Sequence, residues 1–290
     1  MDLARPDLRP DPSLSRDEME ALQREIAAAA TFDDEHALDP AAVAVEEAAS
    51  LADGLPPARD DAQEQLGTGA AGASTGTAAD ADAPTVVGVD QAFLTDRGED
   101  RPDAAVSAAV ALRGGSVVEY ASATTPLSIP YIPGLLAFRE GEPILAALDT
   151  LDTEPDLLVC DGSGRIHFRE AGLATHVGVL RDVPSVGVAK SLLCGEPDES
   201  TAERPEGWRT PVRADDAVTT AEPGTAIGHA FQSRQYPNSR RVNPLYVSPG
   251  HRVSAERAVD LVEALCAGYK LPEPTRLADA HAERVKRNAE

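Results

Sequence analysis

The spacing of apolar positions changes at Thr85 and divides the chain into two regions. Upstream, apolar residues recur at helical spacing between Ser15 and Ala30, and Ser15 with Glu18 has the pattern of a capping box. We therefore predict an amphipathic helix there. The rest of residues 1–83 is rich in Ala, Asp, Glu, Gly and Thr and poor in apolar bulk, which predicts an acidic, largely flexible extension.

From Thr85 onward, apolar runs joined by short turns predict an antiparallel meander, and the later runs alternate with helical segments. This order predicts an α/β fold over residues 84–270, with a mixed β-sheet flanked by helices. Residues 196–222 are predicted to be an acidic loop, 248–251 a turn, and 271–290 a charged C-terminal tail. The predicted strands are 85–93, 104–112, 116–124, 156–160, 185–188, 226–232 and 244–247, and the predicted helices are 142–151, 172–180 and 255–267.

The chain carries 49 Asp and Glu residues against 26 Lys and Arg residues, so its formal net charge is −23. Dense carboxylates hold hydration, and salt screens their mutual repulsion, so this composition is typical of a protein from a salt-loving organism. An acidic chain ordinarily argues against nucleic-acid binding. In a halophilic protein that argument is weaker, and the question becomes whether arginines and a metal gather locally.

The cysteines, Cys160, Cys194 and Cys266, are odd in number and scattered, which fits neither a disulfide framework nor a zinc site. We therefore expect a reducing, intracellular setting and a cytoplasmic protein. No apolar run approaches membrane-spanning length, and the N-terminus lacks the apolar core of a signal peptide. No membrane partner is expected.

Three carboxylates occupy unusual places in the predicted elements. Asp90 lies in the middle of a Val- and Gly-rich strand, Glu140 lies at a helix start, and Asp161 ends a buried strand before glycines. A buried carboxylate is costly unless it is paired or bound to a metal. Carboxylates that converge at sheet ends make an oxygen-rich site that suits Mg²⁺. The alternative is three separate carboxylates, each hydrogen-bonded in its own turn.

The segment Ser128–Glu140 places Tyr131 and Ile132 between Pro130 and Pro133. Proline fixes φ and restricts the residue before it, so these four residues are predicted to form a stiff finger with an apolar tip. Such a finger suits a wedge that separates stacked bases. The alternative is a surface turn whose tyrosine packs back on the core.

These patterns together resemble the endonuclease V family, repair nucleases with a ribonuclease H-like fold that act on deaminated adenine. The resemblance covers about residues 84–195 and 226–267. Three departures are Phe168, where the family usually has a proline before the arginine, the divergent segment 196–222, and the insertion Thr31–Ala83 after the first helix. The matching segments are Gly88–Asp90, Pro130–Glu140, Pro155–Asp156, Asp161–Gly164, His167 with Arg169, Gly172–Gly178, Pro184–Lys190 and Ser248–His251.

The resemblance implies a role for each matched residue. Asp90, Asp161 and Glu140 would hold catalytic Mg²⁺, with Mn²⁺ as a substitute. Lys190 would contact the phosphate or position the nucleophile, and His251 would orient or deprotonate water. Their alternatives are an ordinary lysine at a strand end and a histidine in a turn. The DNA-binding wedge would comprise Pro130, Tyr131, Ile132 and Pro133, and the base pocket Gly134, Leu136, Gly162, His167 and Gly187.

The implied activity is a Mg²⁺-dependent nick at the second phosphodiester bond 3′ of a deoxyinosine, leaving 3′-hydroxyl and 5′-phosphate ends. The partner would be DNA containing deoxyinosine, and we expect a monomer. An inosine-specific endoribonuclease is the alternative with the same chemistry, and a pocket for the 2′-hydroxyl would distinguish it. A non-catalytic inosine-binding module would predict loss of Asp90 or Asp161, and both are present.

Overall fold

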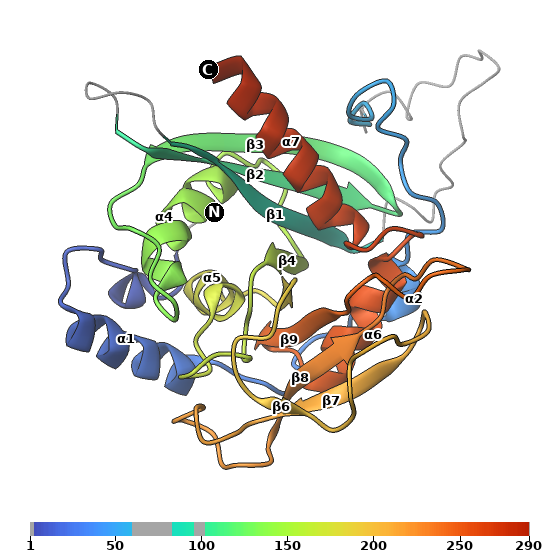
Figure 1. Cartoon of the computed structure of the whole chain (residues 1–290). Helices are drawn as coiled ribbons and strands as arrows, with labels where there is room; N and C mark the ends of the chain where they lie inside the picture. The colour runs from blue at the N-terminus through green and yellow to red at the C-terminus, as the bar shows by residue number, and fades with distance from the viewer. Residues whose placement is uncertain (1–2, 60–82, 96–101, 290) are drawn as a thin grey trace.

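A computed structural model describes residues 3–59, 83–95 and 102–289 of the chain. These residues form one mixed sheet with the strand order β3-β2-β1-β4-β5-β9-β8-β7-β6, and helices lie on both of its faces (Figure 1). The predicted mixed α/β fold is confirmed.

The predicted meander forms the first part of the sheet. Strand β1 (Thr85–Leu94) pairs antiparallel with β2 (Ala104–Arg113), which pairs antiparallel with β3 (Ser116–Pro126). On its other side, β1 pairs in parallel with β4 (Leu157–Asp161), and β4 pairs in parallel with β5 (Ser185–Ala189). The carboxyl ends of β4 and β5 therefore meet at the same edge of the sheet.

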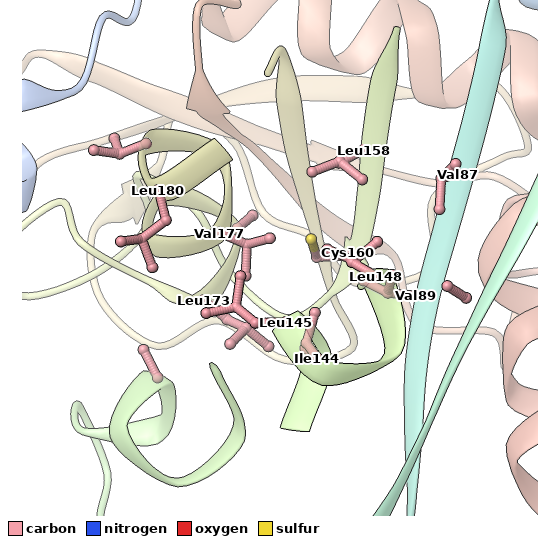
Figure 2. Close-up of a cluster of buried hydrophobic side chains, with 14 of the residues drawn as sticks. Val87, Val89, Ile144, Leu145, Leu148, Leu158, Cys160, Leu173, Val177 and Leu180 are labelled. Atoms are coloured by element: carbon pink, nitrogen blue, oxygen red, sulfur yellow. The ribbon is translucent and has the colours of Figure 1, made fainter. Parts of the chain in front are cut away.

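Two pairs of helices cover the two faces of this sheet. Helices α4 (Leu136–Leu148) and α5 (Leu173–Arg181) pack on one face, where Figure 2 shows their apolar side chains against β1 and β4. Helices α6 (Ala255–Leu265) and α7 (Glu273–Ala289) pack on the other face. Because both faces are covered, the central strands are nearly continuous apolar runs. Helix α4 begins at Leu136, earlier than predicted, so Glu140 lies inside the helix.

The second part of the sheet contains more strand than predicted. Strands β8 (Ala226–Phe231) and β9 (Leu245–His251) form the expected antiparallel pair. The predicted acidic loop holds two strands, β6 (Glu196–Pro197) and β7 (Arg209–Arg213). The predicted turn at 248–251 is instead the end of β9. Both errors occur at strands that contain proline, a residue that cannot donate a ladder hydrogen bond and that argues against a strand assignment.

The N-terminal region packs on the domain more extensively than predicted. Helix α1 (Arg16–Ala29) is present with its capping box, as expected. It is preceded by η1 (Pro6–Leu8), whose Leu8 is buried, and followed by α2 (Pro40–Val43). The Val45 amide donates to the Ala264 carbonyl at 2.9 Å, so this segment is anchored on α6. The remainder of the predicted flexible extension, 60–82, lies outside the described residues.

The predicted C-terminal tail is a helix. Leu277, Ala278 and Ala282 on α7 are buried against β1 and β2, and Glu273 and Arg276 near its start are buried as an ion pair. The many charged residues of 271–290 favoured the prediction of a tail, although the apolar residues in this segment recur at the spacing of an amphipathic helix. None of the described helices is long and apolar enough to cross a membrane.

Candidate active site

A cavity of about 390 Å³ opens where β1, β4, β5, α4 and α7 meet. Four carboxylates line it, together with Lys190 and the exposed ring of Tyr131. The carboxylates are Asp90, Glu140, Asp161 and Asp279. The predicted acidic residues and the predicted finger therefore share one cavity, which they reach from four different elements.

The strand register explains why Asp90 and Asp161 are neighbours. The last parallel pair between β1 and β4 is Val89 with Cys160, and the two aspartates follow one residue later. Side chains alternate between faces along a strand, so both aspartates leave the α4 and α5 core and point toward the α7 side. Neighbouring strands lie about 4.8 Å apart, which places the two carboxylates close together.

Burial and the charge of Asp161 raise the pKa values of the other three carboxyls in the cavity. Burial first, and the charge of Asp161 second, raise the pKa of Asp90 to about 8, and the Oδ2 atom of Asp90 is buried without a hydrogen-bond partner. Burial also raises the pKa of Glu140 to about 7, partly offset by Arg139, and raises the pKa of Asp279. A cation placed among these groups would relieve the repulsion.

Lys190 supplies one positive charge to the cavity. Its Nζ lies 2.6 Å from Asp161 Oδ2. Burial lowers the pKa of Lys190, but the charge and hydrogen bond of Asp161 outweigh burial and raise it overall. The ammonium group therefore stays charged at the mouth of the acidic cluster, where a phosphate oxygen would approach.

The side-chain oxygen atoms that line the cavity are the type of ligand that a hard divalent cation prefers. All four acidic side chains offer oxygen, and the unpartnered Asp90 Oδ2 is a buried acceptor that lacks a donor. In the part of the chain that the structure describes, no three of these side chains are already gathered as ligands around one point. The Lys190–Asp161 ion pair occupies part of that space. Metal binding by Asp90, Asp161 and Glu140 therefore stays a prediction.

The finger stands out from the surface at one side of the cavity. Tyr131 is 64% exposed and lines the cavity. The alternative, in which this tyrosine packs back on the core, does not match the structure. Pro130 and Pro133 are also exposed, whereas Ile132 turns inward against the core.

A second cavity of about 50 Å³ adjoins the first and shares Tyr131 and Leu136 with it. Gly134 and His167 line this second cavity, and Gly162 lines the first, so four of the five predicted pocket residues line one of the two cavities. Gly187 lines neither. A Cβ atom there would overlap the backbone nitrogen of Gly164, so its role is to let the Asp161–Gly164 turn pack on β5.

The assignment of His251 to the catalytic site is not supported by its position. His251 pairs with Ser185 at the start of β5, whereas the cavity lies at the end of that strand near Ala189. Four residues of strand separate the two by about 13 Å. The ring is occupied elsewhere: Nδ1 accepts from the Thr31 amide at 3.2 Å, and Nε2 lies 3.1 Å from Asp182 Oδ1. This histidine ties the N-terminal segment to α5.

Asp279 is a site residue that the sequence pattern did not predict. It projects from α7, and its charge interacts with those of Lys190 and Asp161. The segment that carries it has the composition of a charged tail, which gives no reason to bring it to the sheet. The usable signal was the spacing of Leu277, Ala278 and Ala282, which marks a face that must be buried.

Gly88 allows α7 to carry Asp279 to the cavity. A Cβ atom at this position would overlap the carbonyl carbon of Pro274, at the start of α7. We expect Gly88→Ala to lower the free energy of unfolding by about 1–3 kcal/mol, as overpacking does, and to reduce nicking because the helix must shift. Thermal melting and nicking rates test this. Gly141→Ala, whose Cβ would meet only the Pro10 ring at 3.3 Å, is the stability control; equal effects of both would contradict the role of Gly88.

The strand order β3-β2-β1-β4-β5, with acidic side chains from the middle of β1 and the end of β4 converging opposite a helix, defines a nuclease of the ribonuclease H-like class. Comparison with known proteins gives the family. The family model described as Endonuclease V matches residues 73–280, and the chain belongs to the endonuclease V family.

Two haloarchaeal relatives match over nearly the whole length of the chain. Endonuclease V of Natronomonas pharaonis is 57% identical over 286 residues, covering 99% of this chain and 98% of the relative. Endonuclease V of Haloarcula marismortui is 54% identical over 288 residues, with the same coverage. The solved structure from Streptomyces avermitilis is 32% identical, with a TM-score of 0.66 over 97% of this chain and 98% of that one. The two haloarchaeal relatives agree with the salt-adapted composition.

Proposed function

We propose that this enzyme nicks DNA at the second phosphodiester bond 3′ of a deoxyinosine, leaving 3′-hydroxyl and 5′-phosphate ends. The observation that carries the proposal is that the acidic cluster and the exposed Tyr131 face one cavity. A wedge next to a hydrolytic centre suits an enzyme that opens the duplex at a lesion. The solved endonuclease V of Ciona intestinalis was crystallised with DNA containing an inosine followed by a ribo-adenosine. A monomeric, cytoplasmic enzyme is part of the same proposal.

The residues of the cavity have separate tasks in this proposal. Asp90, Asp161 and Glu140 would hold Mg²⁺ or Mn²⁺, which when bound polarises the scissile phosphate and activates water. Lys190 would release its ion pair with Asp161 and donate a hydrogen bond from its ammonium group to a phosphate oxygen instead. Tyr131 would occupy the space that the displaced base leaves in the duplex. The small cavity at Gly134 would receive part of the displaced base.

One stretch of the acidic chain carries several arginines and no Asp or Glu: Arg234, Arg240, Arg241 and Arg252 lie within residues 223–255. Residues 120–139 and 223–255 are the two longest stretches without Asp or Glu, and the first of them holds the finger. The second includes the loop 233–243, where the Arg234 guanidinium lies 5.6 Å from the ring centre of Tyr269. Tyr269 in turn stacks with Arg276 of α7 at 4.3 Å.

This loop adjoins the active site. Ser233 Oγ donates to the Lys270 carbonyl at 2.6 Å, and the pKa of Lys270 is lowered by burial and by the charge of Lys190. Arg240 and Arg241 at the loop tip are exposed, and Arg240 donates to the Glu203 carbonyl at 2.9 Å, which orders it without neutralising it. We expect this surface to contact backbone phosphates beside the cleaved strand.

Arg240→Ala combined with Arg241→Ala should weaken binding without changing the chemical step. Removal of one phosphate contact should reduce the slope of log affinity against log salt by about 0.9, so the slope should fall by up to about 2. Fluorescence anisotropy over a range of KCl in which the protein stays folded measures this slope. The control is Arg5→Ala with Arg213→Ala, two arginines whose side chains are each 44% exposed. An unchanged slope would show that the loop does not contact phosphate.

The proposed function is tested with a duplex that contains one deoxyinosine, in molar KCl with Mg²⁺, beside an undamaged duplex and an RNA version. We expect a single cut one nucleotide beyond the inosine in DNA. A cut confined to RNA would favour the inosine-specific endoribonuclease. No cut of either with a folded protein and added Mn²⁺ would overturn the proposal in favour of a binding role.

A further inference from the structure

The finger rests on the N-terminal helix α1. Met19 of α1 forms an apolar cluster with Leu135 and Phe138, and Ile129 and Ile132 pack against it. These two isoleucines flank the exposed Tyr131. Helix α1 ends at Ala29, so it lies wholly outside residues 73–280, the part of the chain that the family model matches.

A buried polar contact joins the same helix to the base of the finger. Gln23 of α1 is fully buried, and its Nε2 donates to the Gly134 carbonyl at 2.8 Å. Its Oε1 accepts from Arg169 Nε at 2.7 Å. Arg169 is itself buried, and its Nη2 lies 3.4 Å from the same Gly134 carbonyl. Both polar ends of Gln23 are thus engaged, which holds the amide in one orientation.

His167 completes the arrangement as a third donor. The Arg169 amide donates to His167 Nδ1 at 3.2 Å, so Nδ1 carries no proton and the hydrogen must be on Nε2. That Nε2 lies 3.1 Å from the Gly134 carbonyl, to which it donates. Burial lowers the pKa of His167 to about 3, so the ring stays neutral and the arrangement does not depend on pH near neutrality.

The carbonyl that these groups hold is at a decisive point of the chain. Gly134 has φ +80°, a left-handed conformation that favours glycine, and it ends the finger and lines the small cavity. The other end of the finger is held by Arg139, whose Nη1 donates to the Ile129 carbonyl at 2.9 Å. The finger is therefore fixed at both ends, once by α4 and once by α1.

We propose that α1, through Gln23 acting with Arg169, is a positioning element that holds the finger rigid for insertion into duplex DNA. The inference rests on the proposed function. Separating stacked bases costs energy, and a finger free to swing would yield instead of opening the stack. A substrate that is already unpaired makes no such demand. Gln23 should therefore matter for duplex substrates and not for single-stranded ones.

The test compares Gln23→Leu, which removes both hydrogen bonds at similar size, with Arg24→Leu on the exposed face of the same helix. We expect Gln23→Leu to lower kcat/KM on duplex deoxyinosine roughly 3- to 10-fold, as loss of a buried hydrogen bond does, with little change on the single strand. A 2-aminopurine base beside the lesion should show less fluorescence gain on binding. Arg24→Leu should change neither.

A second variant separates positioning from folding. Gln23→Glu keeps the acceptor for Arg169 but cannot donate to the Gly134 carbonyl, so it should keep α1 docked and show the same selective loss. Equal losses on duplex and single strand, or no loss in either variant, would overturn the inference. If the unaltered enzyme cuts neither substrate, the proposed function itself fails. The fluorescence gain then decides the positioning role separately.

Discussion

Replacing Asp161 by Asn is expected to lower the nicking rate by more than about 100-fold, because even groups one step removed from a metal cost about 10–100-fold when they are removed. Asn keeps the size of the side chain and an acceptor for Lys190, which lies 2.6 Å away. What it removes is the negative charge that would hold the metal. Binding to deoxyinosine DNA should persist, since Asp161 contributes charge and not the wedge.

The same substitution should leave the metal-free protein at least as stable. Burial is the main reason that the pKa of Asp90 is raised to about 8 and that of Glu140 to about 7, and the charge of Asp161 contributes to both increases. Carboxyls with raised pKa values bind more protons folded than unfolded, so the stability they contribute is lost as pH rises from about 4 to about 8. Without the charge of Asp161, the pKa values of Asp90 and Glu140 should be raised less, so less stability should be lost over this pH range.

Nicking assays and thermal melting with a chelator at pH 5 and pH 8 check both parts of this expectation. Asp198→Asn is the control, because Asp198 pairs with Arg213 away from the cavity. A normal nicking rate in the Asp161→Asn variant would show that Asp161 does not hold the metal. A variant that melts much earlier than the unaltered protein at pH 8 would mean that Asp161 serves the fold.

The parts of the site that could be predicted are those fixed by local rules. Asp90 and Asp161 could be predicted because strand alternation and the ends of buried apolar runs are visible in the sequence. The finger could be predicted because proline restricts its neighbours. His251 was assigned to the site by the family resemblance, and the assignment was wrong because β9 carries this histidine to the start of β5, at the other end of the sheet. Which end of a strand a residue reaches depends on pairing, and pairing is not local.

Two other residues show what tertiary contacts add. The position of Asp279 depends on where α7 docks, and that docking requires the absence of a side chain at Gly88 on a distant strand. Gln23 did carry a signal, because it falls on the buried side of α1 beside Met19 and Ile26. A polar residue on an apolar helix face needs a partner. The sequence cannot say that its partner is the carbonyl at the base of the finger.

Tyr131→Ala should lower kcat/KM on duplex deoxyinosine by about 5- to 150-fold, because stacking of an aromatic ring with a base is worth about 1–3 kcal/mol. Cutting of the single-stranded substrate should change little. The melting temperature should also be unaffected, since the ring is 64% exposed and leaves no cavity when it is removed. Tyr131→Phe, which keeps the apolar tip, is the control and should cut duplex at nearly the normal rate.

Combining Tyr131→Ala with Gln23→Leu gives the sharper result. If Gln23 acts by holding the finger, the loss of its hydrogen bonds matters only while the finger carries its tyrosine. The double variant should then cut duplex no more slowly than Tyr131→Ala alone, a non-additive outcome that independent sites do not give. If the losses of the two single variants multiply, Gln23 does not act through the finger. If Tyr131→Ala cuts duplex and single strand as well as the unaltered enzyme does, Tyr131 does not act as a wedge.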